Sequence, residues 1–212
     1  MTRYGDIALG VECALPGLVG PSPRRRRILP WLAALMVVAG ALQFGQGAWI
    51  HAKAQLAQVL IERALTRTLA GEAAVKPWPW ADTWPVARLE APAHGVSLLV
   101  LSGASGRTIA FGPGHQHGTA LPGSGGNSVI GGHRDTHLSF LKHVRRGEIL
   151  RVQRADGGFA EYRVTQLDVL DKSETWVTRN LGGTRLTLIT CWPFDALRAG
   201  GPERYVVIAE RT

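Results

Sequence analysis

The chain has 212 residues, of which 45% are hydrophobic and 26 are glycine, so it can hold one ordinary globular domain with accessory segments. A net charge of +8 would indicate a nucleic-acid-binding protein if the basic residues formed one face or arm. The densest basic run is Arg24–Arg27, and the apolar segment after it indicates a different use of the charge. We therefore expect no nucleic-acid partner.

The N-terminal region predicts a membrane anchor. Residues 1–27 are rich in Gly and Pro and read as a cytoplasmic tail. Residues 28–50 contain no charged side chain, and a helix of that length rises roughly 34 Å, enough for a hydrocarbon core of about 30 Å. Trp31 and Trp49 lie near its ends, where indoles favour the membrane interface. We expect a single-pass transmembrane helix over residues 28–50.

Two alternatives to an anchor remain open at this stage, a buried core helix and a cleaved signal peptide. The apolar stretch is longer than the roughly 7–15 residues of a signal-peptide core, which favours an uncleaved anchor. Four arginines precede it and only Lys53 follows closely, so the N-terminus is expected in the cytoplasm and the rest beyond the membrane. Cys13 and Cys191 then lie on opposite sides, and Cys191 has no intrachain partner there.

Residues 51–85 are expected to form a stalk helix and a linker. One helical face of the stalk is apolar at every fourth residue, namely Ala57, Ile61, Leu65 and Leu69. Gly71 is expected to end the helix. Three prolines in residues 76–85 exclude regular structure and mark the boundary of the next domain, residues 86–212.

From Val86 the apolar pattern changes to that of short strands, with almost no long helix between them. "ADGG" between two of these strands indicates a hairpin. Such a pattern is typical of an all-β fold, a closed barrel or a sandwich. The expected strands cover residues 97–103, 108–112, 127–133, 147–154, 157–171, 184–190 and 204–211.

Three residues at expected strand ends could carry chemistry together. His133 ends "VIGGH", Cys191 ends "TLITC", and Arg204 opens the last strand. Singly, a cysteine is more often a small buried apolar residue, a histidine is more often a satisfied polar residue than a catalyst, and an arginine at a strand edge is usually solvated. Together, a thiolate can attack a carbonyl, an imidazole can serve as acid to the leaving amine, and a guanidinium can stabilise the oxyanion. This trio suits acyl transfer through a thioester.

These motifs resemble those of the sortase family. "TLITC" resembles the sortase signature T-L-x-T-C, "GGHRDTH" resembles the block that holds the family's histidine, and Arg204 stands where the family's arginine opens the strand after the cysteine loop. The resemblance covers roughly residues 86–211. It implies a closed eight-stranded β-barrel in which Cys191 is the nucleophile, His133 the general acid/base and Arg204 the residue that aligns substrate and stabilises the oxyanion. Thr190 is expected to line the substrate groove.

The resemblance also implies the reaction and its partners. A sortase cleaves a sorting motif near the C-terminus of a secreted protein and passes the acyl group to an amine acceptor, a peptidoglycan amine or a protein. The Arg-rich, Ala/Trp-rich composition resembles the proteobacterial sortases, which places the domain in the periplasm and the anchor in the inner membrane. Some sortases bind calcium through acidic loops, and no acidic cluster here indicates such a site. No cofactor or metal is expected.

Several assignments stay open. His137 is a rival for the acid/base role, and Arg198 is a rival for the role of Arg204. Asp135 could tune its surroundings, and the two histidines of "HQH" lack an evident third metal ligand.

Two other functions compete with the sortase reaction. An L,D-transpeptidase is also a β-rich Cys/His acyltransferase, but its cysteine usually follows Ser-x-Gly, which "LITCWP" lacks. A non-enzymatic, membrane-tethered binding module would keep Cys191 buried and inert.

Overall fold

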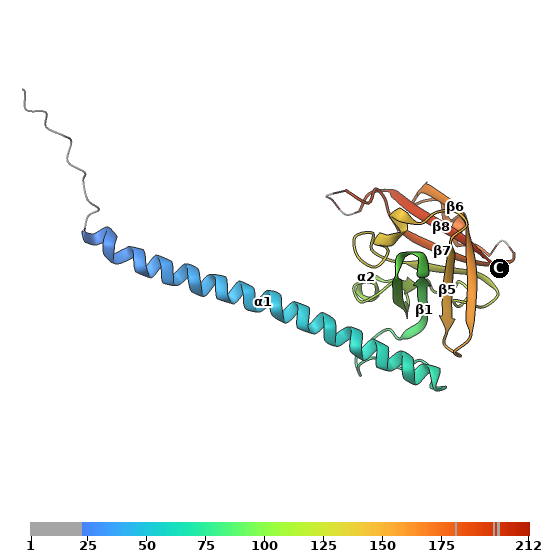
Figure 1. Cartoon of the computed structure of the whole chain (residues 1–212), viewed down its shortest axis with the longest axis horizontal. Coiled ribbons are helices and arrows are strands. Elements are labelled where there is room, and N and C mark those ends of the chain that lie inside the picture. Colours follow the sequence, from blue (N-terminus) through green and yellow to red (C-terminus); the bar gives the residue numbers. More distant parts are fainter. Residues whose placement is uncertain (1–22, 181, 197, 199) are drawn as a thin grey trace, which may run out of the picture. The chain divides into compact units, whose positions relative to one another are not determined.

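The computed structural model describes residues 23–212 except residues 181, 197 and 199 (Figure 1). Most of the expected tail, including Cys13, lies outside the described residues. The chain divides into two compact units, Met1–Ile50 and His51–Thr212, and each is described by itself.

The first unit consists of the N-terminal part of helix α1 (Pro23–Leu69). Its large apolar side chains are exposed, with 78% of Trp31 and 80% of Phe44 accessible. The described residues contain one helix that is long and apolar enough to cross a membrane, and this is α1. A bilayer would cover the apolar side chains that water would otherwise contact. The helix is therefore a candidate membrane anchor.

In the second unit the end of α1 packs against the β-barrel. The predicted apolar stripe is confirmed, because Ala57, Ile61 and Leu65 are buried. Ile61 and Leu65 contact Leu99 and Leu101 of strand β2 (Val96–Ser102). Burying an Ile or Leu side chain contributes roughly 1.5–3 kcal/mol. The stalk is thus fixed to the barrel by its own apolar face.

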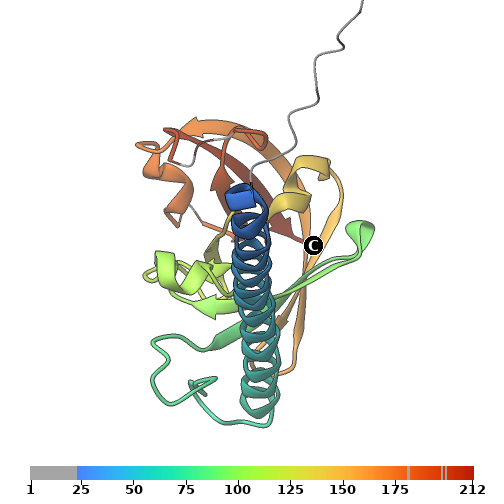
Figure 2. The ribbon, with the colours of Figure 1, turned by 90° about the vertical axis from the view of Figure 1, so that its left-hand side faces the viewer.

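Within the described residues eight strands close into a barrel in the order β1-β2-β3-β4-β7-β8-β6-β5 (Figures 1 and 2). The all-β barrel expected from the sequence is confirmed. Two of the strand pairs are parallel, β2 with β3 and β4 with β7, and the others are antiparallel. The remaining strands are β1 (Pro85–Ala91), β3 (Gly114–His115), β4 (Gly126–Gly131), β5 (Ile149–Arg154), β6 (Phe159–Asp171), β7 (Thr184–Cys191) and β8 (Glu203–Arg211).

Alternating side chains fill the barrel interior. Along β1 every second residue is buried, and Leu89 joins a core that includes Leu150, Tyr162 and Leu188. The expected hairpin joins β5 to β6, where Gly157 has a φ of 83° that favours glycine. The short helices α2 (Gly106–Ile109), η1 (Pro92–His94), η2 (Ser139–His143) and η3 (Thr175–Thr178) lie in the connections.

The expected strand over residues 108–112 is wrong. Helix α2 and a turn occupy this region, because the Ser105 hydroxyl caps the helix by accepting the backbone N–H of Thr108 at 3.4 Å. The apolar residues of "TIAFG" are typical of a strand. Its Phe111 instead packs edge-on against Trp78 of the linker, with ring centroids 5.2 Å apart.

A buried asparagine ties two strands to the connection between β6 and β7. Nδ2 of Asn127, in β4, donates to the carbonyl oxygens of Val177 and Arg179 at 2.8 and 3.1 Å. Its Oδ1 accepts the hydroxyl of Thr187, in β7, at 2.7 Å. Because the side chain is only 4% exposed, these bonds are shielded from water and hold η3 beside the paired strands.

Candidate active site

Cys191 and Arg204 are paired residues of neighbouring strands. Cys191 ends β7, Arg204 lies near the start of β8, and the two are direct partners in the antiparallel register. The backbone N–H of Trp192 still donates to the Glu203 carbonyl at 3.1 Å, so the pairing persists past the cysteine. Directly opposed residues of an antiparallel pair lie on the same face, with Cβ atoms about 4.5–5.5 Å apart. The thiol and the guanidinium therefore share one face of the sheet.

His133 belongs to the adjacent strand end on the other side of Cys191. Strand β4 runs parallel to β7 and pairs Gly131 with Ile189. The expected strand end at His133 is two residues too far, since β4 ends at Gly131. The pairing continues through Gly132, whose N–H donates to the Ile189 carbonyl at 3.2 Å. Parallel strands end at the same edge of a sheet, so His133 and Cys191 both follow strand ends at one rim of the barrel.

Thr190 fastens these two strand ends together. Its hydroxyl donates to the Gly132 carbonyl at 2.8 Å, and only 2% of the residue is exposed. The bond joins the residue before His133 to the residue before Cys191. It limits how far the histidine and the cysteine can move apart. A contact between Thr190 and substrate remains a prediction.

Exposure differs among the three candidate catalytic residues. His133 is exposed, whereas Cys191 and Arg204 are half-buried. Nη1 of Arg204 donates to the carbonyl oxygens of Gly201 and Glu203 at 2.7 and 2.8 Å. These bonds occupy one guanidinium nitrogen and hold the side chain at the strand start. The guanidinium can still present other N–H groups to a carbonyl.

The charge of Arg204 also acts on Asp171, which ends β6. Two bonds from Ser173 hold the pKa of the Asp171 carboxyl below its ordinary value, and the nearby charges of Lys172 and Arg204 lower that pKa further. The carboxylate is thus ionised at neutral pH. It adds a negative charge to the side of Arg204 that faces β6.

Arg134 links the histidine loop to the cysteine loop, and the sequence analysis missed it. The residue is 9% exposed, and its Nη2 donates to the carbonyl oxygens of Ala196 and Arg198 at 2.8 and 2.9 Å. Nη1 is buried without a hydrogen-bond partner among the described residues. Because Arg134 follows His133 directly, it ties the loop after β4 to the loop after Cys191. The position of Arg134 directly after His133, within "GGHRDTH", was the feature of the sequence that could have indicated this role.

Three aromatic rings brace the start of the cysteine loop. Trp192 stacks on Tyr205 with ring centroids 5.5 Å apart, and Phe194 meets both rings edge-on at 5.6 and 5.2 Å. Phe194 and Tyr205 also pack against the barrel core. Aromatic pairs of this kind contribute about 0.5–1.5 kcal/mol beyond their buried area. They hold Trp192 and Phe194, which follow the thiol closely, against Tyr205 of β8.

The rival residues lie in different surroundings. The side chain of Arg198 is exposed, and the structure engages this residue through its carbonyl oxygen. His137 is half-buried and lines a pocket beside helix α1. Burial lowers the pKa of His137 most, the charge of His133 lowers it further, and exposed Asp135 opposes the shift.

The "HQH" histidines serve the local structure. His115 is buried, and its Nε2 lies 2.8 Å from the Ala120 carbonyl oxygen and 3.1 Å from the Thr119 hydroxyl. His117 contacts the Ser102 hydroxyl at 3.3 Å.

Known proteins share this domain. A family model described as the sortase domain matches residues 89–212. Sortase D of Bacillus subtilis is 29% identical over 124 residues, which are 58% of this chain and 62% of that protein. Sortase A of Listeria monocytogenes is 29% identical over 109 residues, 50% of this chain and 49% of that protein. The chain therefore spans less than two thirds of the length of these curated relatives.

Solved structures agree with the family model. Sortase C-1 from Actinomyces oris is 34% identical and superposes with a TM-score of 0.54. The match covers 60% of this chain and 72% of the Actinomyces protein. Sortase C from Clostridium perfringens, solved with the C-terminal cell wall sorting motif, has a TM-score of 0.56. The match to the Clostridium protein covers 76% of this chain and 89% of that protein. Because the two are only 21% identical, this match shows a similar fold and nothing more. Since the family model matches more than half of the residues, this chain belongs to the sortase family.

Proposed function

We propose that this protein is a membrane-anchored cysteine transpeptidase that cleaves a sorting motif near the C-terminus of a secreted protein. The observation that carries the proposal is the pairing of Cys191 with Arg204 at a barrel rim, beside the strand end that precedes His133. Family membership supports the same reaction.

The first half-reaction forms a thioester. The Cys191 thiol gives its proton to His133, and the resulting thiolate attacks the carbonyl carbon of the scissile peptide bond to form a C–S bond. Arg204 donates hydrogen bonds to the oxygen, on which negative charge develops. As the C–N bond breaks, protonated His133 gives its proton to the leaving amine. The acyl group then remains on Cys191.

The second half-reaction transfers that acyl group to an amine. The nitrogen of a peptidoglycan amine or of a second protein attacks the thioester carbonyl carbon, a C–N bond forms and the C–S bond breaks. The proton that nitrogen loses passes through His133 to the sulfur of Cys191. Thr190 supports the groove by holding the strand ends of Cys191 and His133 together.

The anchor gives the reaction its place. Helix α1 spans the inner membrane over residues 28–50 with the N-terminus in the cytoplasm, and residues 86–212 form the catalytic domain in the periplasm. The lack of charged residues over residues 28–50, the exposed apolar side chains of α1 and the preceding arginines support this arrangement. The arginine-rich composition supports a proteobacterial source.

Thiol labelling tests the enzymatic role. The full chain in detergent micelles would be treated with iodoacetamide, and alkylation of Cys191 followed by peptide mass spectrometry. An enzyme with a half-exposed nucleophile is expected to be alkylated while folded, with loss of acyl transfer. Alkylation of Cys191 only after unfolding would contradict the proposal and favour an inert binding module.

A further inference from the structure

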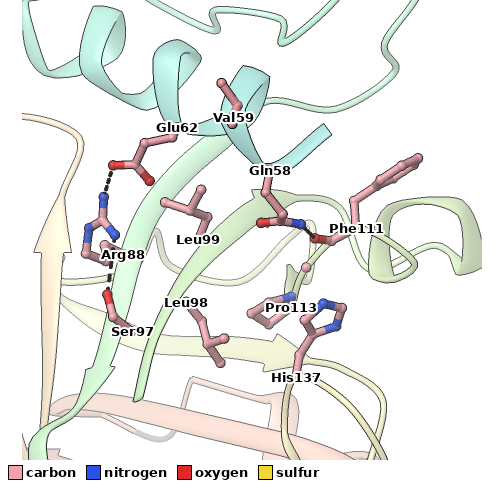
Figure 3. Close-up of a pocket in the computed structure, with 11 residues that line it drawn as sticks. Gln58, Val59, Glu62, Arg88, Ser97, Leu98, Leu99, Phe111, Pro113 and His137 are labelled. Carbon is pink, nitrogen blue, oxygen red and sulfur yellow. Dashed lines mark hydrogen bonds and ion pairs between the residues drawn. The ribbon is translucent and has the colours of Figure 1, made fainter. Parts of the chain in front are cut away.

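A pocket of about 300 Å³ lies between the end of helix α1 and the barrel (Figure 3). Gln58, Val59 and Glu62 of α1 form one side, and β1 and β2 form the other. His137 and Pro113 stand together at one end of the pocket in Figure 3. The pocket exists because the apolar stripe of α1 packs on β2 and leaves this polar turn of the helix above it.

The strand register places this pocket near the loop of His133. Leu101 of β2 pairs with Gly114 of β3, which pairs with Gly131 at the end of β4. Since β2 runs antiparallel to β4, Leu98 and Leu99 lie beyond the end of β4, at the level of the following loop. In the barrel order the pocket is on the β4 side of Cys191, and β8 with Arg204 is on the opposite side.

The polar groups of the pocket offer hydrogen-bond acceptors to an amine. Gln58 uses its Nε2 to donate to the Phe111 carbonyl at 2.7 Å, and within the described residues its Oε1 accepts no hydrogen bond. The Glu62 carboxylate is ion-paired with Arg88, which also donates to Ser97. The Glu62–Arg88 pair is neutral as a unit. The amide oxygen of Gln58, the Glu62 carboxylate and the His137 imidazole remain as hydrogen-bond acceptors for the N–H groups of an amine.

His137 presents a neutral imidazole to the pocket. Burial and the charge of His133 lower the pKa of its imidazole, so the ring is neutral at pH 7. Its Nδ1 lies 3.5 Å from the Thr136 hydroxyl. Apolar side chains of Val59, Leu98 and Leu99 complete the pocket and suit the carbon stem of an alkylamine.

We propose that this pocket receives the primary amine acceptor of the second half-reaction and that His137 removes a proton from that amine. The inference rests on the proposed function, which supplies the thioester on Cys191. It assigns His137 a role separate from that of His133. It also makes α1 part of the acceptor site.

The proton and bond changes balance. An alkylammonium ion gives one proton to His137 and becomes a neutral amine. Its lone pair attacks the thioester carbonyl carbon, a C–N bond forms and the C–S bond breaks. The second proton lost from nitrogen passes through His133 to the sulfur. The products are an amide, the Cys191 thiol and protonated His137.

The test separates amine attack from hydrolysis. Full chain in detergent micelles would be acetylated with p-nitrophenyl acetate, and loss of acetyl-Cys191 followed by mass spectrometry with Cys191→Ala as the blank. The acceptors are triglycine, which offers a backbone amine, and Nα-acetyl-lysine amide, which offers a side-chain amine. For each variant, the rate of acetyl loss that depends on amine is divided by the rate of hydrolysis measured without amine.

Two pairs of variants test the pocket. Val59→Trp fills it, and Leu56→Trp, an exposed position on α1 that does not line it, is the control. Val59→Trp is expected to raise the half-saturating amine concentration at least about tenfold, a loss of about 1.4 kcal/mol. His137→Gln is expected to lower the maximal amine-dependent rate about 10²-fold, whereas His143→Gln, on an exposed residue, changes neither.

The acceptor with the lower half-saturating concentration identifies the source of the amine. Linear, unsaturable dependence on both amines in the wild-type protein would overturn the acceptor pocket. Equal loss of hydrolysis and aminolysis in His137→Gln would overturn the proton-transfer role. Failure to acetylate Cys191 at all would instead contradict the proposed function, so the two failures are distinguishable.

Discussion

Cys191 and Arg204 stand directly opposite each other at the open ends of β7 and β8. The relationship is set by backbone pairing, and it does not depend on a long side chain reaching across a cleft. Seven registered pairs, from Arg185–Glu210 to Cys191–Arg204, align the two strands. This ladder restrains the separation of the two residues, which the proposed roles of nucleophile and oxyanion donor require.

Replacing Arg204 by Ala is expected to lower kcat for acyl transfer about 10²–10³-fold, because removal of an oxyanion donor has effects of this size. The fold should persist, since Arg204 is half-buried and its Nη1 donates only to the carbonyl oxygens of the nearby Gly201 and Glu203. Steady-state kinetics together with a circular dichroism spectrum would check both expectations. Arg198→Ala is the matched control and should keep most of its activity. The reverse ranking would transfer the role to Arg198.

Arg134 is expected to act as a positioning residue. Arg134→Ala removes both bonds to the cysteine loop, and Arg134→Lys cannot replace the planar guanidinium that reaches two carbonyls. Both variants should raise KM for the sorting substrate and accelerate amide hydrogen exchange at Ala196 and Arg198. Exchange that is unchanged while activity is lost would show that Arg134 does not act through this loop.

Thr190→Val is expected to lower stability by about 1 kcal/mol, because the Gly132 carbonyl loses its hydroxyl donor in a buried site. In a chain of this size that corresponds to a fall in Tm of about 2–4 °C. Thr190→Ser retains the hydroxyl and should recover most of the loss. Thermal unfolding of the three proteins measures this. If Thr190→Val and Thr190→Ser have the same Tm, the hydrogen bond from the Thr190 hydroxyl contributes little to stability.

Stability is expected to fall as the pH is lowered below about 6.5, the ordinary pKa of histidine. Burial lowers the pKa of His115 in the folded protein, and the charge of His117 lowers it further. The unfolded chain therefore binds more protons than the folded one in this range, and protonation favours unfolding. The contribution is fully present above pH 6.5 and is lost toward the lowered pKa.

Tm measured between pH 8 and pH 5 tests this. His115→Gln can keep a donor to the Ala120 carbonyl but has no charge to gain, so its Tm should depend less steeply on pH. A Gln variant with the same slope as the wild-type protein would show that other groups cause the pH dependence. His137 shifts in the same direction and would be the next residue to replace.

Much of the fold could be predicted from the sequence, because it follows from the spacing of apolar residues and from turn residues that are close together in the chain. The spacing of Ile61 and Leu65 predicted the buried face of the stalk, and "ADGG" predicted the β5–β6 hairpin. The end of β7 at Cys191 agrees with the change from β-forming residues to Trp-Pro. The sequence could not show that the stalk packs on β2, since an apolar stripe does not name the surface that covers it.

The parts that were missed depend on long-range contacts or on a cap. Arg134 looks like any charged loop residue until the chain brings Ala196 to it from 62 positions away. Residues 108–112 are of strand-forming types, but the Ser105 cap starts a helix at Gly106 that runs into this segment. His137 appeared as a rival catalyst, and its place in a pocket depends on α1, which is remote in sequence.

The most direct test of the central claim is to trap the acyl-enzyme. Full chain in detergent micelles would be incubated with secreted proteins from the same cell, and adducts on Cys191 identified by mass spectrometry before and after hydroxylamine. The account predicts a hydroxylamine-labile thioester between Cys191 and the N-terminal fragment of a cleaved protein, joined through the carbonyl at the cleavage point, present in the wild-type chain and absent from Cys191→Ala. An adduct that persists in Cys191→Ala, or a reactive Cys191 that acquires no thioester, would contradict it.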